Sequence, residues 1–232
     1  GLVGSEMCIR DRNMNAKKLS FLLLILVAVA CTNRSTSSEQ DEMRHWNNVL
    51  QQINALLLEN KAQQTLDLAK QTLPEILESA EKNGTTDTLI YYARKIFNAC
   101  GNNYINTKQY KDGIDYMDSI GNHPLIREHC PHELLSFKAG LNQLYGNNPE
   151  AVRLAEDYLQ LPVCTSANDF IRQAEIISGV YMYSGNNLPK AIQILEKAID
   201  VYRKGGNFPN MLRIMSRLGI YYPVSYTHLT LP

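Results

Sequence analysis

The 232-residue sequence lacks long hydrophobic segments, an excess of either charge, and a dense set of cysteines. Its longest apolar run is the 10 residues from Phe21 to Ala30, well short of the roughly 20 that a membrane-spanning helix needs. Lys and Arg number 23, and so do Asp and Glu, so no basic surface is offered to nucleic acid and none is expected as a partner. With 44% hydrophobic residues the chain can still bury a sizeable core, which excludes global disorder.

Motifs of catalysis are also missing. The sequence contains no phosphate-binding Gly-rich loop, no His-Glu-x-x-His helix and no Gly-x-Ser-x-Gly elbow, so no catalytic residue, metal or cofactor is expected. His129, Cys130 and His132, with Cys164, could supply zinc ligands, and a metal-dependent enzyme built on them is one alternative. A single short cluster lacks the paired spacings of structural zinc sites, however, and Pro131 reads as the ordinary first turn of a helix.

The two ends of the sequence can be encoded by one inverted DNA repeat. Residues 6–11 (EMCIRD) can be encoded by DNA whose reverse complement encodes residues 224–229 (VSYTHL). Such a repeat resembles the transposase end sequence of sequencing libraries. We therefore expect residues 1–13 and 223–232 to be translated adapter, the native chain to start near Met14, and its true C-terminus to lie beyond Tyr222.

The segment after Met14 is typical of an exported protein. Lys17 and Lys18 form a basic start, an apolar stretch follows, and Ala28 and Ala30 precede Cys31. This pattern resembles a bacterial lipoprotein signal, which implies cleavage after residue 30, lipidation of Cys31 and a location in the bacterial cell envelope, anchored through the N-terminal lipid. An ordinary signal peptide with an incidental cysteine is the alternative.

Residues 31–42 then read as a flexible tether, because residues 32–41 (TNRSTSSEQD) contain no apolar side chain. The exported part would hold 19 basic and 21 acidic residues, a net charge of −2. Three of its cysteines follow the tether, Cys100, Cys130 and Cys164, which is not the pattern of a small disulfide-stapled domain.

From Met43 onward, Pro and Gly separate amphipathic stretches of helical length, so an all-α fold is predicted. Small residues recur within it at 38 to 40 residues: Gly101, Ala139, Gly179 and Gly219 form one series, and Gly113, Ala151 and Ala191, each twelve residues after a member of the first, form another. Such a period is the signature of stacked helix hairpins.

This spacing resembles the tetratricopeptide repeat (TPR), a hairpin of helices A and B that stacks into a right-handed superhelix. The expected repeat domain covers residues 43–222, incomplete at its C-terminus. Its expected A and B helices are 43–60 with 61–82, 87–105 with 107–120, 132–145 with 148–161, and 167–184 with 188–204, followed by a last helix A from about Pro209. In the first pair Trp46, Ala62, Ala69 and Pro74 match the repeat, but its small residue Ala62 lies 51 residues before Gly113.

In the TPR family, helix A lines a groove that binds protein or peptide. The first two predicted A helices place amide side chains on that face: Asn47, Gln51, Asn54, Asn98, Asn102 and Asn106. Asn inside a helix costs roughly several tenths of a kcal/mol relative to Ala, and an amide can both donate to and accept from a peptide backbone. A peptide groove is one interpretation of this row, and a polar surface in an amide-rich protein is the other. Tyrosines such as Tyr104, Tyr181 and Tyr183 are expected in the core.

Two further expectations follow. Cys130 and Cys164 bracket one predicted hairpin at the same end, so a disulfide between them is possible in an exported protein. The expected function is a non-catalytic scaffold for a protein or peptide partner in the bacterial envelope. The alternative is the extracytoplasmic sensor region of a truncated sensor kinase or transcriptional regulator.

Overall fold

The computed structural model describes residues 40–162, 167–205 and 208–230, and its regular structure within those ranges is helical, with no strand. The first helix spans residues 40–58. The following helices are α2 (Ala62–Asn83), α3 (Asp87–Asn106), α4 (Tyr110–Ile120), α5 (Pro124–His129), α6 (Pro131–Tyr145), α7 (Asn148–Gln160), α8 (Ala167–Tyr183), α9 (Leu188–Gly205) and α10 (Phe208–Thr230). Each helix of the four predicted pairs is present, with both ends within three residues of the prediction. None of the helices in these ranges is long and apolar enough to cross a membrane.

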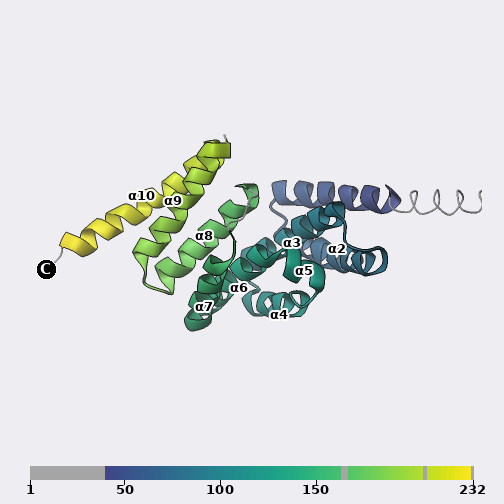
Figure 1. Ribbon diagram of the computed structural model, residues 1–232, viewed down its shortest axis with the longest axis horizontal. Helices are drawn as coiled ribbons and strands as arrows, with labels where there is room; N and C mark the ends of the chain where they lie inside the picture. Colours follow the sequence, from purple (N-terminus) through teal and green to yellow (C-terminus); the bar gives the residue numbers. More distant parts are fainter. Residues whose placement is uncertain (1–39, 163–166, 206–207, 231–232) are drawn as a thin grey trace, which may run out of the picture. The chain divides into compact units, whose positions relative to one another are not determined.

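The chain divides into two compact units, residues 1–48 and 49–232. Within the second unit, the helices follow one another in space in the order of the sequence (Figure 1). Helix A packs on its own helix B in the pairs α3 with α4, α6 with α7, and α8 with α9, and each A helix also packs on the next, from α3 to α6 to α8 to α10. This is an α-hairpin solenoid of the TPR-like type.

Small residues allow these helices to approach one another, but not always where the period placed them. Ala139, Ala151 and Ala191 are fully buried, as expected. The crossing of α6 with α8 depends on Gly140 instead of Ala139, because a Cβ on Gly140 would lie 2.6 Å from Ile176 Cγ2. Gly219 also fits the period, but a Cβ built on it has no neighbour within 4 Å. Within the described residues, no close helix contact therefore requires a glycine at position 219.

The 51-residue gap before the second repeat comes from the length of α2. This helix has 22 residues, whereas α4 has 11 and α7 has 13. α2 runs through Pro74 and still packs along α3. The longer helix accounts for the irregular spacing without a break in the stacking of α2 on α3.

Two features of the second unit were not predicted. The short helix α5 lies between the second and third pairs, and its first turn is capped by His123, whose Nδ1 accepts from the backbone N of Leu125 at 3.2 Å. Glu133 at the start of α6 is buried and forms an ion pair with Arg94 of α3 at 3.2 Å, and Arg94 Nη2 also donates to the His129 carbonyl oxygen at 2.5 Å. These contacts connect α3 to the end of α5 and to the start of α6.

The tether and the core tyrosines need partial correction. The first helix begins at residue 40, so the last three residues of the predicted 31–42 tether are helical. Tyr104 and Tyr181 are buried as predicted, but Tyr183, the last residue of α8, is 68% exposed. Helical spacing alone did not separate the two kinds of tyrosine.

Candidate functional site

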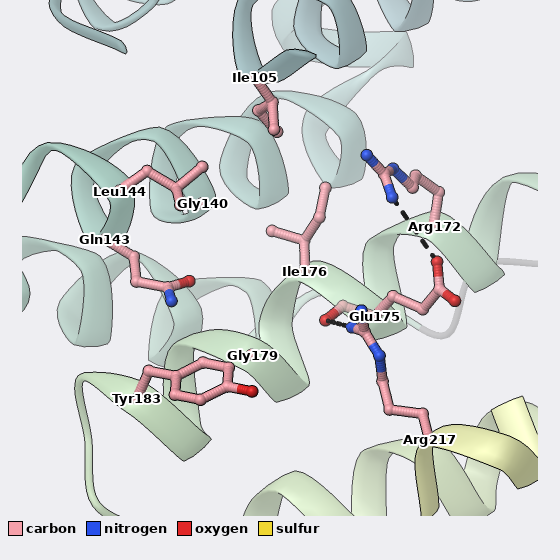
Figure 2. A pocket seen from close by; sticks show the side chains of 10 residues that line it. All are labelled: Ile105, Gly140, Gln143, Leu144, Arg172, Glu175, Ile176, Gly179, Tyr183 and Arg217. Atoms are coloured by element: carbon pink, nitrogen blue, oxygen red, sulfur yellow. Dashed lines mark hydrogen bonds and ion pairs between the residues drawn. The ribbon is translucent and has the colours of Figure 1, made fainter. Parts of the chain in front are cut away.

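A pocket of about 180 Å³ opens on the A-helix side of the second unit. We call it the A-face pocket, and Figure 2 shows the ten residues that line it: Ile105 of α3, Gly140, Gln143 and Leu144 of α6, Arg172, Glu175, Ile176, Gly179 and Tyr183 of α8, and Arg217 of α10. All ten belong to predicted A helices. The pocket therefore lies on the side of the solenoid that the TPR resemblance assigned to a ligand.

Two glycines shape the pocket in opposite ways. Gly140 lets the Ile176 side chain pack directly against the α6 backbone, and both residues line the pocket. Gly179 faces open space, because a Cβ built there would meet only Gln143 Oε1, at 3.8 Å. A larger side chain at position 179 would consequently enter the pocket without displacing backbone.

Charged side chains converge at one side of the pocket. Arg172 lies one turn before Glu175 on α8, with Nη1 3.8 Å from Glu175 Oε2. Arg213 of α10 donates from Nη2 to the same oxygen at 2.9 Å, and Arg217 donates from Nη1 to the backbone oxygen of Glu175, also at 2.9 Å. We call these four residues the arginine cluster. In Figure 2, Arg172 and Arg217 flank Glu175, and Gln143 and Leu144 lie across the pocket from them.

The amide side chains of the predicted row differ from one another in exposure. Asn98 and Asn102 are half-buried, whereas Asn47, Gln51, Asn54 and Asn106 are exposed. Asn102 reaches the arginine cluster, since its Oδ1 accepts from Arg172 Nε at 2.7 Å. The structure thus brings Asn102 to the border of the A-face pocket, while the role of the row as a peptide groove stays a prediction.

Local hydrogen bonds explain why Asn is tolerated inside these helices. Asn102 donates to the carbonyl oxygen of Asn98 at 2.9 Å, Asn103 to that of Ala99 at 2.8 Å, and Asn142 to that of Lys138 at 2.9 Å. Each side chain bonds the carbonyl four residues earlier, a known alternative use of a polar side chain in a helix. Much of the amide content is therefore satisfied within the helices themselves.

The cysteine and histidine predictions have mixed outcomes. Cys130 is fully buried at the start of α6, but Cys164 and Cys31 lie outside the described residues, so the disulfide and the lipidation stay predictions. His132 Nε2 donates to the Pro162 carbonyl oxygen at 2.7 Å. Among the residues that the structure describes, no group of three or more His, Cys, Asp or Glu side chains is placed to hold a metal ion.

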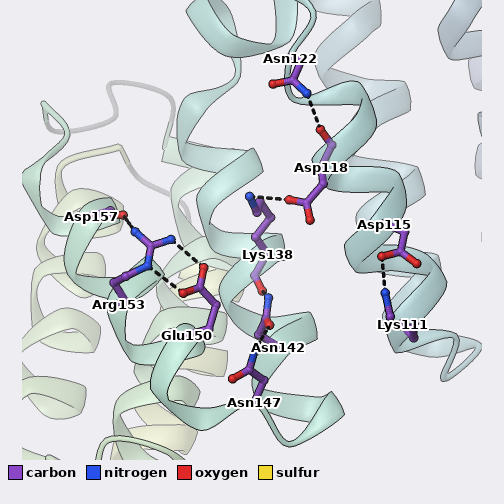
Figure 3. A network of polar contacts seen from close by, with 10 residues as sticks. All are labelled: Lys111, Asp115, Asp118, Asn122, Lys138, Asn142, Asn147, Glu150, Arg153 and Asp157. Atoms are coloured by element: carbon purple, nitrogen blue, oxygen red, sulfur yellow. Dashed lines mark hydrogen bonds and ion pairs between the residues drawn. The ribbon is translucent and has the colours of Figure 1, made fainter.

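The outward side, formed largely by B helices, carries charges that pair with one another (Figure 3). Asp118 of α4 accepts from Lys138 at 2.6 Å, and Arg153 of α7 bridges Glu150 and Asp157, each at 2.6 Å. The hydrogen bond from Arg153 lowers the pKa of Glu150, so this carboxylate is ionised at neutral pH and is no general acid. This surface offers compensated charge, unlike the A-face pocket.

Sequence reasoning did not find the arginine cluster. Arg213 and Arg217 are four residues apart and thus share one face of α10, which is a signal that the sequence contains. Nothing in the local sequence indicates, however, that this face of α10 contacts Glu175, which lies about one repeat earlier in the chain. The meeting depends on how α10 packs beside α8.

Comparison with known proteins adds little beyond the fold. No family model and no curated protein matches the chain. Two solved structures are similar to it: the TPR-like repeats of a putative kinesin light chain from Podosopora anserina, and a variant of the same repeats with one residue substituted. Each is 12% identical with a TM-score of 0.49, and the match covers 78% of this chain and 87% or 86% of those chains, respectively. The description of the fold rests on the helix pairing above.

Proposed function

We propose that this protein is a non-catalytic scaffold that binds a protein partner through a peptide segment laid along α3, α6, α8 and α10. The observation that carries this proposal is the A-face pocket, to which successive A helices all contribute. We further propose that lipidation at Cys31 anchors the scaffold in a bacterial envelope, as the signal sequence predicts.

The size and lining of the pocket favour a side chain over a cofactor. At about 180 Å³ the pocket lies below the range of roughly 300–1,000 Å³ that is usual for small-molecule and cofactor sites. Its walls combine apolar groups, such as Ile105, Leu144 and Ile176, with hydrogen-bonding groups, such as Gln143 and Arg172. One or two side chains of an extended peptide match that combination.

The test is selection from a displayed library of random peptides, followed by fluorescence anisotropy with the selected sequences. A Gly179→Leu variant places an apolar side chain in the pocket, and Ser119→Leu introduces the same residue at an exposed position of α4. We expect the selected peptides to bind Gly179→Leu at least about tenfold more weakly than wild type, a loss of about 1.4 kcal/mol, and to bind Ser119→Leu unchanged. Failure to select any peptide, or equal binding to both variants, would contradict the proposal.

A further inference from the structure

The side of the A-face pocket that holds the arginine cluster has more positive than negative charge. Arg172, Arg213 and Arg217 gather around Glu175, whose side chain is only 7% exposed. Among the described side chains that line the pocket, Glu175 is the one carboxylate. Two positive charges there consequently have no negative partner within the cluster.

Glu175 also satisfies these guanidinium groups incompletely. Its Oε2 accepts from Arg213 at 2.9 Å, while Arg172 Nη1 stays 3.8 Å away and Arg217 binds the backbone oxygen instead. Burial first, and then the charges of Arg213 and Arg217, lower the pKa of Arg172 against the opposing effect of Glu175. The guanidinium remains charged, and the neighbouring charges of Arg213 and Arg217 add a repulsion to the cost of its burial. A second anion beside Glu175 would relieve that repulsion.

The geometry points to a carboxylate-binding subsite for an acidic peptide segment. An Asp or Glu side chain of the partner accepts hydrogen bonds from the arginine cluster, and an apolar side chain next to it occupies the space between Ile105, Leu144 and Ile176. Guanidinium groups suit this role because their fixed donor geometry matches a carboxylate. The inference rests on the proposed peptide-binding function and specifies the chemistry of the peptide.

The surroundings favour an acidic peptide over a nucleic acid. A phosphate backbone is bound by many cations along a track, whereas this chain has no net charge and the cluster holds three arginines. The apolar wall beside it also needs an aliphatic or aromatic group adjacent to the anion. A peptide that alternates acidic and apolar side chains supplies both groups from neighbouring residues.

The first experiment needs no variant of the protein. A random peptide library is panned against the wild-type chain, and Asp and Glu are counted in the selected sequences relative to the starting library. For the strongest binder, a second peptide with every Asp and Glu replaced by Asn and Gln is synthesised, and both affinities are measured at low and high NaCl. We expect acidic residues to be enriched, the amide peptide to bind at least about tenfold more weakly, and only the acidic peptide to lose affinity with salt.

The second experiment locates the subsite. Arg172→Gln and Arg217→Gln are each expected to weaken the acidic peptide at least about tenfold and to leave the affinity for the amide peptide nearly unchanged. Arg153→Gln removes the same charge from α7 on the outward side and is expected to leave both affinities unchanged. Thermal denaturation of each variant separates a lost contact from a lost fold.

The possible outcomes distinguish the two proposals. If peptides are selected without enrichment of Asp or Glu, or if the amide peptide binds equally well, the carboxylate subsite is wrong and the peptide groove stands. If no peptide is selected, both proposals fail. A single-stranded oligonucleotide that displaces the acidic peptide at equal charge concentration would overturn the assignment to a peptide.

Discussion

Gly101 lies against the ring of Phe137 where α3 crosses α6. A Cβ at this position would be 2.5 Å from Phe137 Cγ, and Phe137 is itself 1% exposed, so its ring has no free space to enter. We expect Gly101→Ala to lower the free energy of unfolding by about 1–3 kcal/mol, the usual cost of overpacking a core. Urea denaturation measures this change as a lower midpoint.

Gly179→Ala is the matched control, because a Cβ there makes only an ordinary contact with Gln143. Removing a glycine from the interior of a helix stabilises it by about 0.5–1 kcal/mol, so the two substitutions should move the midpoint in opposite directions. Equal midpoints for the two variants would mean that α3 and α6 do not approach as described.

The thiol of Cys100 should be unreactive in the folded protein. Burial raises its pKa from near 9 to about 12, and its Sγ donates to the hydroxyl oxygen of Tyr116 at 3.8 Å. Because the thiolate is the reactive form, iodoacetamide at pH 8 is expected to leave Cys100 unmodified until urea is added. Peptide mass spectrometry before and after unfolding checks this, and modification of the native protein would contradict the burial.

The same shift has a consequence for alkaline stability. The folded state holds the Cys100 proton more tightly than the unfolded state, so the stabilisation from this group is complete below about pH 9 and is lost as pH rises toward 12. A Cys100→Ala variant should therefore lose less stability than wild type between those pH values, whatever its stability at pH 7. Parallel curves of urea midpoint against pH would show that the thiol does not contribute.

At the scale of the element, α2 keeps a proline inside a continuous helix. Pro74 lacks a backbone N–H and crowds the preceding turn, which ordinarily ends or kinks a helix. Beyond it, α2 continues to Asn83, and three apolar side chains of that extension are buried: Ile76, Leu77 and Ala80. Burial of this apolar face against the rest of the unit offsets the cost of the proline.

We expect Pro74→Ala to raise the free energy of unfolding by about 1–3 kcal/mol, since position 74 is exposed and alanine restores the missing hydrogen bond. Gln71→Ala, at another exposed position of α2, should change it by less than about 0.5 kcal/mol. Urea midpoints of the two variants test the comparison. A destabilised Pro74→Ala protein would indicate that α2 depends on a bend at this residue.

At the scale of the whole molecule, the open prediction is the anchor. If Cys31 carries lipid, the chain expressed from Met14 in a bacterial host should incorporate labelled fatty acid and sediment with membranes. Cys31→Ser should abolish both properties, because the thiol is the atom that is acylated, whereas Thr32→Ala should retain both. Unlabelled, fully soluble wild-type protein would refute lipidation and favour an ordinary signal peptide.

The sequence by itself determined the class of fold and the bounds of its helices. Apolar residues that recur every 3.6 positions, and the Gly and Pro residues between such stretches, are local signals. They predicted helices such as 87–105 and 188–204, whose ends lie within three residues of those of α3 and α9. The six-residue α5 was not predicted, because a helix of fewer than two turns is too short for apolar residues to recur at helical spacing. Recurrence at 38 to 40 residues then predicted that the hairpins stack.

Only the tertiary structure decided which residues form the candidate site. Asn102 and Arg172 are 70 residues apart in the chain and bond at 2.7 Å, and Glu175 meets Arg213 and Arg217 of another hairpin. Such meetings depend on the rotation and the sideways shift of one helix against another, which are set by packing details such as Gly140 beneath Ile176. The period in the sequence places the small residue of a helix crossing only approximately. It predicted Ala139 at the crossing of α6 with α8, whereas Gly140 makes the close contact, and a shift of one residue turns different side chains of a helix toward the pocket.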